Sequence, residues 1–292
     1  MALISSKPLG TLIRVADSDG GNGAANYEIA DINNLVPGGV VLVRKNIYST
    51  SAFGSTANYP NGTLDNLIKT TIYNKMPQNL RDKMMDVTFN LSGSGNITRK
   101  MFALTYTMAG FGNNNGVAEG KALQLYTSNA SRIKTFNGSA DYWWLSSRSP
   151  SNFVHIVSLD GSTLGDSNAS SDGVVPAFVI PQSEMLKDSA NADGSYSIKY
   201  RIICCTVNMG SAEEQPKAAL PIISCNGNLT LKICNNANDA SPAWETAANE
   251  TVHNFANTTK TAAQWAIGLK IDITRTAGEN LFLNEPVVLA MK

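Results

Sequence analysis

The chain has 292 residues, of which 43% are hydrophobic and only 16% are charged, so it contains enough apolar residues for real cores and global disorder is excluded. Its 23 basic and 23 acidic residues cancel, which argues against a nucleic-acid partner, because phosphates require a basic surface. No apolar run approaches the roughly 20 residues of a membrane span, and the N-terminus lacks the basic and apolar regions of a signal peptide. We therefore expect synthesis in a cytoplasm and no membrane insertion.

The first part of the chain predicts an α+β domain. Strands are predicted over residues 9–16, 40–43 and 98–107, and the second of these is an uninterrupted apolar run typical of a buried strand. Two helices are predicted between them, one beginning at Thr63 and one at Pro77, because a capping residue and a first-turn proline precede apolar residues at helical spacing.

The stretch from Ser139 to Ile180 is the most distinctive part of the sequence. A run of small polar residues, 162–172, lies between two rigid apolar ends, and this composition is typical of a recognition surface. A surface hairpin with a long tip is the alternative interpretation. The residues expected to form a structural frame are Tyr142, Trp143, Trp144, Gly173 and Pro176. Because Trp143 and Trp144 are adjacent in an extended chain, one is expected in the core and the other partly exposed.

The same stretch resembles a known family. The order Tyr142-Trp143-Trp144-Leu145, Arg148-Ser149-Pro150, Asp160-Gly161 and Gly173-Val174-Val175-Pro176-Ala177-Phe178 is similar to the end of C-type-lectin-like domains of gut bacteria and their phages, where "WWLRSP … GVRPA" is usual. Two departures stand out. Ser146-Ser147 intervene before Arg148, and Val175 replaces the usual arginine, so a salt bridge made by that arginine is not expected here.

The resemblance implies a function for the polar loop. In the best-known phage relatives, the loop-rich end of the domain displays residues varied by diversity-generating retroelements, and a corresponding surface here would contact a receptor. The predicted ligand-binding residues are Asn152, Phe153, His155, Thr163, Leu164, Asp166, Asn168, Ser170 and Ser171. The alternative is that these are ordinary loop residues of a protein that contacts only its neighbours on a particle.

The last third of the chain predicts only strands. Alternating apolar residues and the hairpin signal Asn226-Gly227 favour an immunoglobulin-like sandwich. The polar residues before it predict a linker. The complete prediction is an α+β C-type-lectin-like domain over 1–186, a linker over 187–196, and an all-β immunoglobulin-like sandwich over 197–292 that serves as an attachment domain.

No catalytic constellation is found in the sequence. His155 and His253 lie in different predicted domains, and no Gly-X-Ser-X-Gly elbow or Cys-X-X-Cys zinc spacing occurs. The lectin-like fold includes enzymes that use cysteines within the domain, but all four cysteines here follow residue 200. We predict no enzymatic activity, no cofactor and no dedicated metal ligands. A loose calcium site on Asp160, Asp166 and Asp172 stays open.

These observations predict a non-enzymatic bacteriophage protein that is assembled in the host cytoplasm and displayed at the virion surface. Its first domain is expected to bind a host cell-surface glycan or protein. Its second domain is expected to contact other virion proteins, with the chain forming a homo-oligomer on the particle. Two further functions stay open: a capsid decoration or head-fibre protein without a specific receptor, and a bacterial surface adhesin, which the missing signal peptide disfavours.

Overall fold

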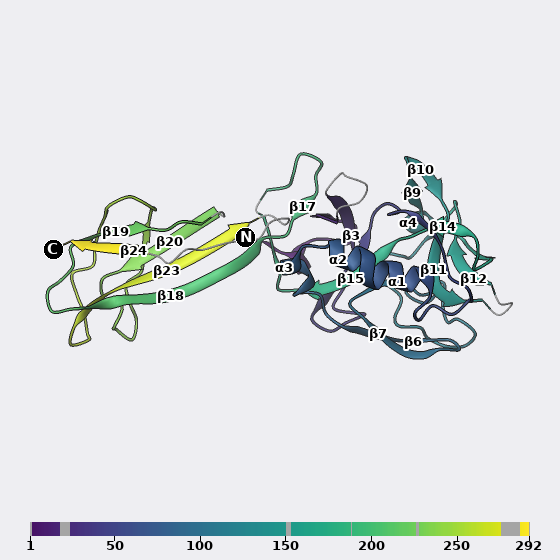
Figure 1. The fold of residues 1–292 in the computed structure, drawn as a ribbon, viewed down its shortest axis with the longest axis horizontal. Helices are drawn as coiled ribbons and strands as arrows, with labels where there is room; N and C mark the ends of the chain where they lie inside the picture. The colour runs from purple at the N-terminus through teal and green to yellow at the C-terminus, as the bar shows by residue number, and fades with distance from the viewer. Residues whose placement is uncertain are drawn as a thin grey trace. The chain divides into compact units, whose positions relative to one another are not determined.

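Figure 1 presents the fold as a computed structural model, which describes residues 2–17, 24–149, 153–187, 189–225, 228–275 and 287–291. The chain forms two compact units, Met1–Ile198 and Lys199–Lys292. Among the described residues, strands account for 43% and helices for 9%. The protein is therefore mostly β.

Unit 1 contains a six-stranded sheet with the order β17-β2-β3-β4-β15-β8. Its strands are β2 (Leu12–Val15), β3 (Ala25–Ile32), β4 (Gly39–Arg44), β8 (Met101–Ala103), β15 (Pro176–Pro181) and β17 (Tyr196–Ser197). Strand β4 pairs antiparallel with both β3 and β15 and is buried along its whole length. An uninterrupted apolar run suits a strand covered on both faces. The predicted buried strand at 40–43 is confirmed.

A five-stranded sheet with the order β13-β12-β11-β14-β5 carries the predicted recognition stretch. Its strands are β5 (Thr50–Ala52), β11 (Trp143–Arg148), β12 (Val154–Val157), β13 (Thr163–Asp166) and β14 (Ser171–Gly173). Strands β12 and β13 form an antiparallel hairpin, and β13 lies at the edge of the sheet. Trp143 of β11 pairs with Gly173 of β14, so the two rigid ends of the stretch meet.

Smaller elements complete unit 1. They are β1 (Ala2–Leu3), a 3₁₀ turn (Ile4–Ser6), α1 (Thr63–Asn66), a π-helical segment (Leu67–Ile72), α2 (Tyr73–Lys75), α3 (Gln78–Arg81), β6 (Val87–Leu91), β7 (Gly95–Arg99), α4 (Asn129–Arg132), β9 (Lys134–Phe136), β10 (Ser139–Asp141) and β16 (Met185–Leu186). The helix predicted to begin at Thr63 is confirmed, since α1, the π-helical segment and α2 follow one another directly and bury Leu64, Ile68 and Ile72.

Both tryptophans of the frame are fully buried, so the prediction that one of them is partly exposed is wrong. Their side chains do leave the strand toward different partners. The indole Nε1 of Trp143 donates to the carbonyl oxygen of Arg132 at 3.0 Å, and that of Trp144 donates to Ser51 at 2.8 Å. Phe53 packs edge-on against Trp144 with ring centroids 5.4 Å apart. Segments from elsewhere in the chain thus cover the sheet on both sides.

The predicted α+β C-type-lectin-like domain is wrong. In the described part of unit 1, Thr63–Lys75 is the one helical run longer than two turns, and it cannot form a helical layer by itself. The apolar residues are instead distributed over several small sheets. The apolar parts of the motifs behind the resemblance lie largely in β11 and β15, and apolar strands of this kind occur in many buried sheets.

The predicted immunoglobulin-like sandwich in unit 2 is also wrong. The strands are β18 (Tyr200–Ala212), β19 (Ala218–Ile222), β20 (Asn228–Cys234), β21 (Glu245–Ala247), β22 (His253–Asn254), β23 (Trp265–Arg275) and β24 (Val287–Met291). They form sheets with the orders β18-β23-β20-β21 and β22-β19-β24, and the long β18 and β23 lie side by side (Figure 1). In immunoglobulin domains the first strand shares a sheet with the second, fifth and fourth. The alternation of apolar and polar residues predicts strands, but it does not predict which distant strands pair.

One boundary of the sequence prediction, the start of the second domain at residue 197, bears on the division into units. Tyr196–Ser197 pair in parallel with β2, so the chain contributes to the six-stranded sheet up to the end of unit 1. The hairpin signal Asn226-Gly227 lies outside the described residues. The core of unit 2 is formed by Ala219, Ile223, Leu231, Ile233, Ile267, Leu269, Ile271 and Ile273.

The contact between β11 and β14 requires a residue without a side chain. A Cβ atom on Gly173 would lie 2.6 Å from the carbonyl oxygen of Tyr142 and 2.7 Å from Cδ1 of Ile47. We therefore expect Gly173→Ala to lower the free energy of unfolding by about 1–3 kcal/mol. The matched variant Gly165→Ala, whose Cβ would meet no atom closer than 3.4 Å, is expected to have little effect. Chemical denaturation followed by tryptophan fluorescence measures both, and equal losses would contradict the packing argument.

Candidate functional site

The loop between β13 and β14 is tied to the rest of unit 1 by its own polar side chains. Asn168 Nδ2 donates to the carbonyl oxygen of Gly54 at 2.6 Å, and its carbonyl oxygen accepts from the amides of Phe53 and Gly54. Asp166 Oδ1 accepts from the hydroxyl of Ser170 at 3.0 Å. These three predicted ligand-binding residues are therefore engaged in holding the loop.

The remaining predicted ligand-binding residues lie on or near the β12–β13 hairpin and β14. Thr163 Oγ1 donates to the carbonyl oxygen of Ile156 at 3.2 Å, and Leu164 and Ser171 are exposed. Asn152 lies outside the described residues. The last two predicted ligand-binding residues are Phe153 and His155. Because side chains alternate along a strand, both point to the same side of the sheet.

His155 belongs to a row of three partly exposed rings, and the exposed Phe153 lies on the same side of the strand. The ring of His155 lies 4.4 Å from that of Tyr106, which lies 5.3 Å from that of Phe111. His155 pairs across the hairpin with Gly165, and a Cβ on Gly165 would lie 3.4 Å from Cβ of Phe153. Because the glycine presents no side chain, nothing at this position of β13 covers the rings. We call Phe111, Tyr106, His155 and Phe153 the aromatic face.

His155 contributes to this face as a neutral ring. Both of its ring nitrogens are enclosed. Burial lowers the pKa of His155 below its usual value, because water no longer stabilises the charged form. Among the residues that the structure describes, no group of three or more His, Cys, Asp or Glu side chains is placed to hold a metal ion.

A buried carboxylate positions Tyr106. Glu119 Oε1 accepts from the amide of Ser92 at 2.8 Å and from Asn114 Nδ2 at 3.0 Å, and Glu119 Oε2 accepts from the hydroxyl of Ser147. The oxygen of Ser147 in turn accepts from the amide of Tyr106 at 2.7 Å. Glu119 is fully buried, so these bonds compensate for the loss of hydration of its charge.

Arg132 supports the other end of the face. Its guanidinium lies 4.2 Å from the ring centroid of Phe111. Its nitrogens donate to the carbonyl oxygens of Ala109 and Gly110, which fixes the chain that leads into Phe111. A cation held over one face of the ring leaves only the other face and the edge for a partner.

Sequence reasoning missed Tyr106 and Phe111. Neither carries a local signal for stacking on His155, since the three residues meet only through tertiary structure. One signal was present, namely the extra Ser146-Ser147 in β11. The structure has a register irregularity between Trp144 and Arg148, and the serines in it bond the segment that carries Tyr106.

Comparison with known proteins assigns no activity to this geometry. A family model described as "Domain of unknown function (DUF6273)" matches residues 38–182, a range that includes the aromatic face. Its description mentions neither C-type lectins nor retroelement variation, so that resemblance stays a hypothesis. No curated protein and no solved structure matches the chain.

The polar loop carries a pH-sensitive carboxyl group. Burial and the neighbouring carboxylates of Asp166 and Asp141 raise the pKa of Asp172 to about 7. The folded chain therefore binds this proton more tightly than the unfolded chain, whose carboxyl has its ordinary pKa of 3.8. It follows that the stability that depends on Asp172 is greatest below about pH 4 and is lost as the pH rises to about 7.

We expect Asp172→Asn to raise the melting temperature at pH 8, where the wild-type carboxyl is charged, and to raise it much less at pH 4. Asp160→Asn serves as the control, because hydrogen bonds from Ser162 lower the pKa of Asp160 and its charged form is already favoured. Differential scanning fluorimetry at both pH values measures the two variants. An equal gain for Asp172→Asn at both values would contradict the assignment.

Proposed function

We propose that the chain is a non-catalytic binding protein whose aromatic face contacts a glycan or protein at a cell surface. The observation that carries the proposal is the row of Phe111, Tyr106 and His155 beside the β12–β13 hairpin, with Phe153, 46% exposed, on the same side of the strand as His155. Partly exposed aromatic side chains supply large contact areas at a low entropy cost and are frequent in binding surfaces.

The environment of the rings favours binding over catalysis. An acid–base catalyst needs a titratable group within hydrogen-bond reach of a substrate. The nitrogens of His155 are enclosed, so its imidazole is better suited to stacking than to proton transfer. The hydrogen bonds of the buried Glu119, which hold the segment that carries Tyr106, also suit a surface that is preorganised before its partner arrives.

We further propose that unit 2 attaches the protein to a particle or to another protein. Ile222 pairs with Val287, and Leu220 pairs with Leu289, so four apolar side chains share one side of the β19–β24 ladder. Val287 and Leu289 are 48% and 51% exposed. An exposed apolar group of this kind often marks a contact between proteins. Display on a bacteriophage virion is one setting that fits both units.

Binding through the aromatic face can be tested with paired variants. We expect Phe153→Ala, and more strongly Phe153→Ala with His155→Ala, to weaken binding of the full chain to intact bacterial cells by about tenfold or more. Leu159→Ala is the control, because Leu159 is 43% exposed in the same hairpin but is not among the four rings. Flow cytometry with labelled protein over a panel of bacterial strains measures the loss.

The single Phe153 variant removes an exposed side chain, so it should fold normally, and its melting temperature checks this. If Phe153→Ala and Leu159→Ala bind every strain as well as the wild type does, the receptor proposal is wrong. If the variants bind normally and the protein is needed only for the integrity of a particle, the capsid-decoration alternative is favoured.

A further inference from the structure

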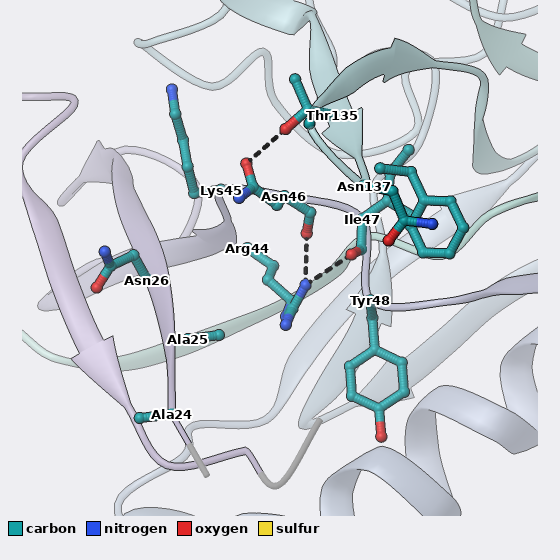
Figure 2. A pocket seen from close by; sticks show the side chains of 12 residues that line it. Ala24, Ala25, Asn26, Arg44, Lys45, Asn46, Ile47, Tyr48, Thr135 and Asn137 are labelled. Atoms are coloured by element: carbon teal, nitrogen blue, oxygen red, sulfur yellow. Dashed lines mark hydrogen bonds between the residues drawn. The ribbon is translucent and has the colours of Figure 1, made fainter. Parts of the chain in front are cut away.

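A pocket of about 590 Å³ lies in unit 1 and shares no residue with the aromatic face. It is bordered by the start of β3, the chain that follows β4, and the β9–β10 hairpin. Figure 2 shows Ala25 and Asn26 on one side, Asn137 and Tyr48 on the other, and Arg44 between them. The complete lining is Ala24, Ala25, Asn26, Arg44, Lys45, Asn46, Ile47, Tyr48, Thr135, Phe136, Asn137 and Gly138.

Arg44 shapes the floor of this pocket. Its Nε donates to Asp17 Oδ2 at 2.9 Å, and its Nη1 donates to the carbonyl oxygens of Asn46 and Ile47, both at 2.8 Å (Figure 2). Because two successive main-chain carbonyl oxygens accept hydrogen bonds from Nη1 of Arg44, the chain turns back just after β4. The fold places Asn46 and Tyr48 along the pocket, and the buried ion pair with Asp17 fixes the guanidinium.

The β9–β10 hairpin forms a second wall. Phe136 pairs with Ser139, and the two residues between them, Asn137 and Gly138, have φ values of 50° and 87°. Such a two-residue turn with both φ values positive matches the twist of the strands, and Asn-Gly is its preferred sequence. Thr135 Oγ1 donates to Asn46 Oδ1 at 3.0 Å, which joins the hairpin to the floor. The pocket is thus built from segments held by hydrogen bonds.

Two amide side chains of the pocket lining, those of Asn26 and Asn137, differ in what they offer a ligand. Asn26 Oδ1 is enclosed and makes no hydrogen bond within the described residues, although Asn26 Nδ2 donates to Asp193. The side-chain amide of Asn137 likewise makes no bond to the described part of the chain. Asn137 is exposed, so its amide can meet a ligand hydroxyl, whereas the enclosed oxygen of Asn26 lies out of a ligand's reach.

The charges around the pocket favour an anion. Its lining residues include Arg44 and Lys45 but no acidic residue. Lys45 Nζ lies 2.6 Å from Glu28 Oε1, and Glu28 also accepts from the buried Lys134. Since one carboxylate is shared by two lysines, this group has an excess of positive charge. Lys45 is 47% exposed, so its ammonium can reach a ligand while Lys134 stays with Glu28.

We propose that this pocket binds an anionic sugar, a single saccharide unit that carries a carboxylate or phosphate beside its hydroxyls. The amide of Asn137 meets the hydroxyls, Lys45 meets the anionic group, and Tyr48 and Phe136 supply ring surface. The combination of amides, a hydroxyl, aromatic rings and a lysine in one concave site suits such a ligand better than an apolar one. The site is additional to the aromatic face and does not depend on it.

The test uses the full chain and three sugar probes in titration calorimetry: digalacturonate, galactose 6-phosphate and the neutral digalactose. We expect at least one anionic probe to bind about tenfold or more tightly than digalactose, with affinity that falls as salt is raised. Asn137→Asp should weaken that binding by about tenfold, because it places a negative charge in the pocket and keeps the positive φ that Asp tolerates.

Asn33→Asp is the matched control. Asn33 also has a positive φ, of 57°, but it follows the far end of β3, whose other end carries Asn26. The variant Asn33→Asp should bind the sugar probes like the wild type. The variant Phe153→Ala should also bind them like the wild type, because the pocket and the aromatic face are separate sites. The proposal is overturned if none of the probes binds, if digalactose binds as well as the anionic probes, if inorganic phosphate alone binds as tightly as the sugar phosphate, or if Asn137→Asp and Asn33→Asp have the same effect.

Discussion

The hydrogen bonds of one buried carboxylate determine where the aromatic face stands. Glu119 cannot keep its charge away from water without donors, and it finds them in the turn after β6, in the glycine- and asparagine-rich loop and in β11. A single side chain therefore joins three segments that are far apart in the sequence. Through Ser147 the same network reaches the amide of Tyr106, and Tyr106 carries the contact with His155. The rigidity of the face follows from this demand for hydrogen bonds.

Unit 1 carries two surfaces with different capacities. The aromatic face lies along a sheet edge, is open, and has few free polar groups, so it suits a large partner that covers apolar area. The pocket beside Arg44 is concave and rich in amides, so it suits one small polar unit. Two modest contacts on one unit strengthen each other when a partner spans both, or when many copies of the protein act together.

The sequence predicts features that depend on neighbouring residues. The buried strand at 40–43 and the helix at Thr63 follow from local patterns, and the Asn137-Gly138 turn carried a local signal that was not used. Features that depend on distant partners were missed. Trp144 is buried because Phe53 and its loop cover it, and the fold class failed because alternation does not determine strand order. The sequence shows Ser146-Ser147 as a departure from a family pattern, but it does not show that Ser147 bonds Glu119.

The most direct test is to remove the carboxylate that positions the face. In Glu119→Ala, amide hydrogen exchange of residues 105–118 should increase while β12 stays protected, and binding to cells should weaken by about tenfold or more. Glu119→Gln, which keeps one acceptor oxygen, should lie between it and the wild type. Glu184→Ala removes a carboxylate outside the network and should bind normally. Faster exchange in 105–118 with unchanged binding would contradict the account, because the aromatic face would then not need its support.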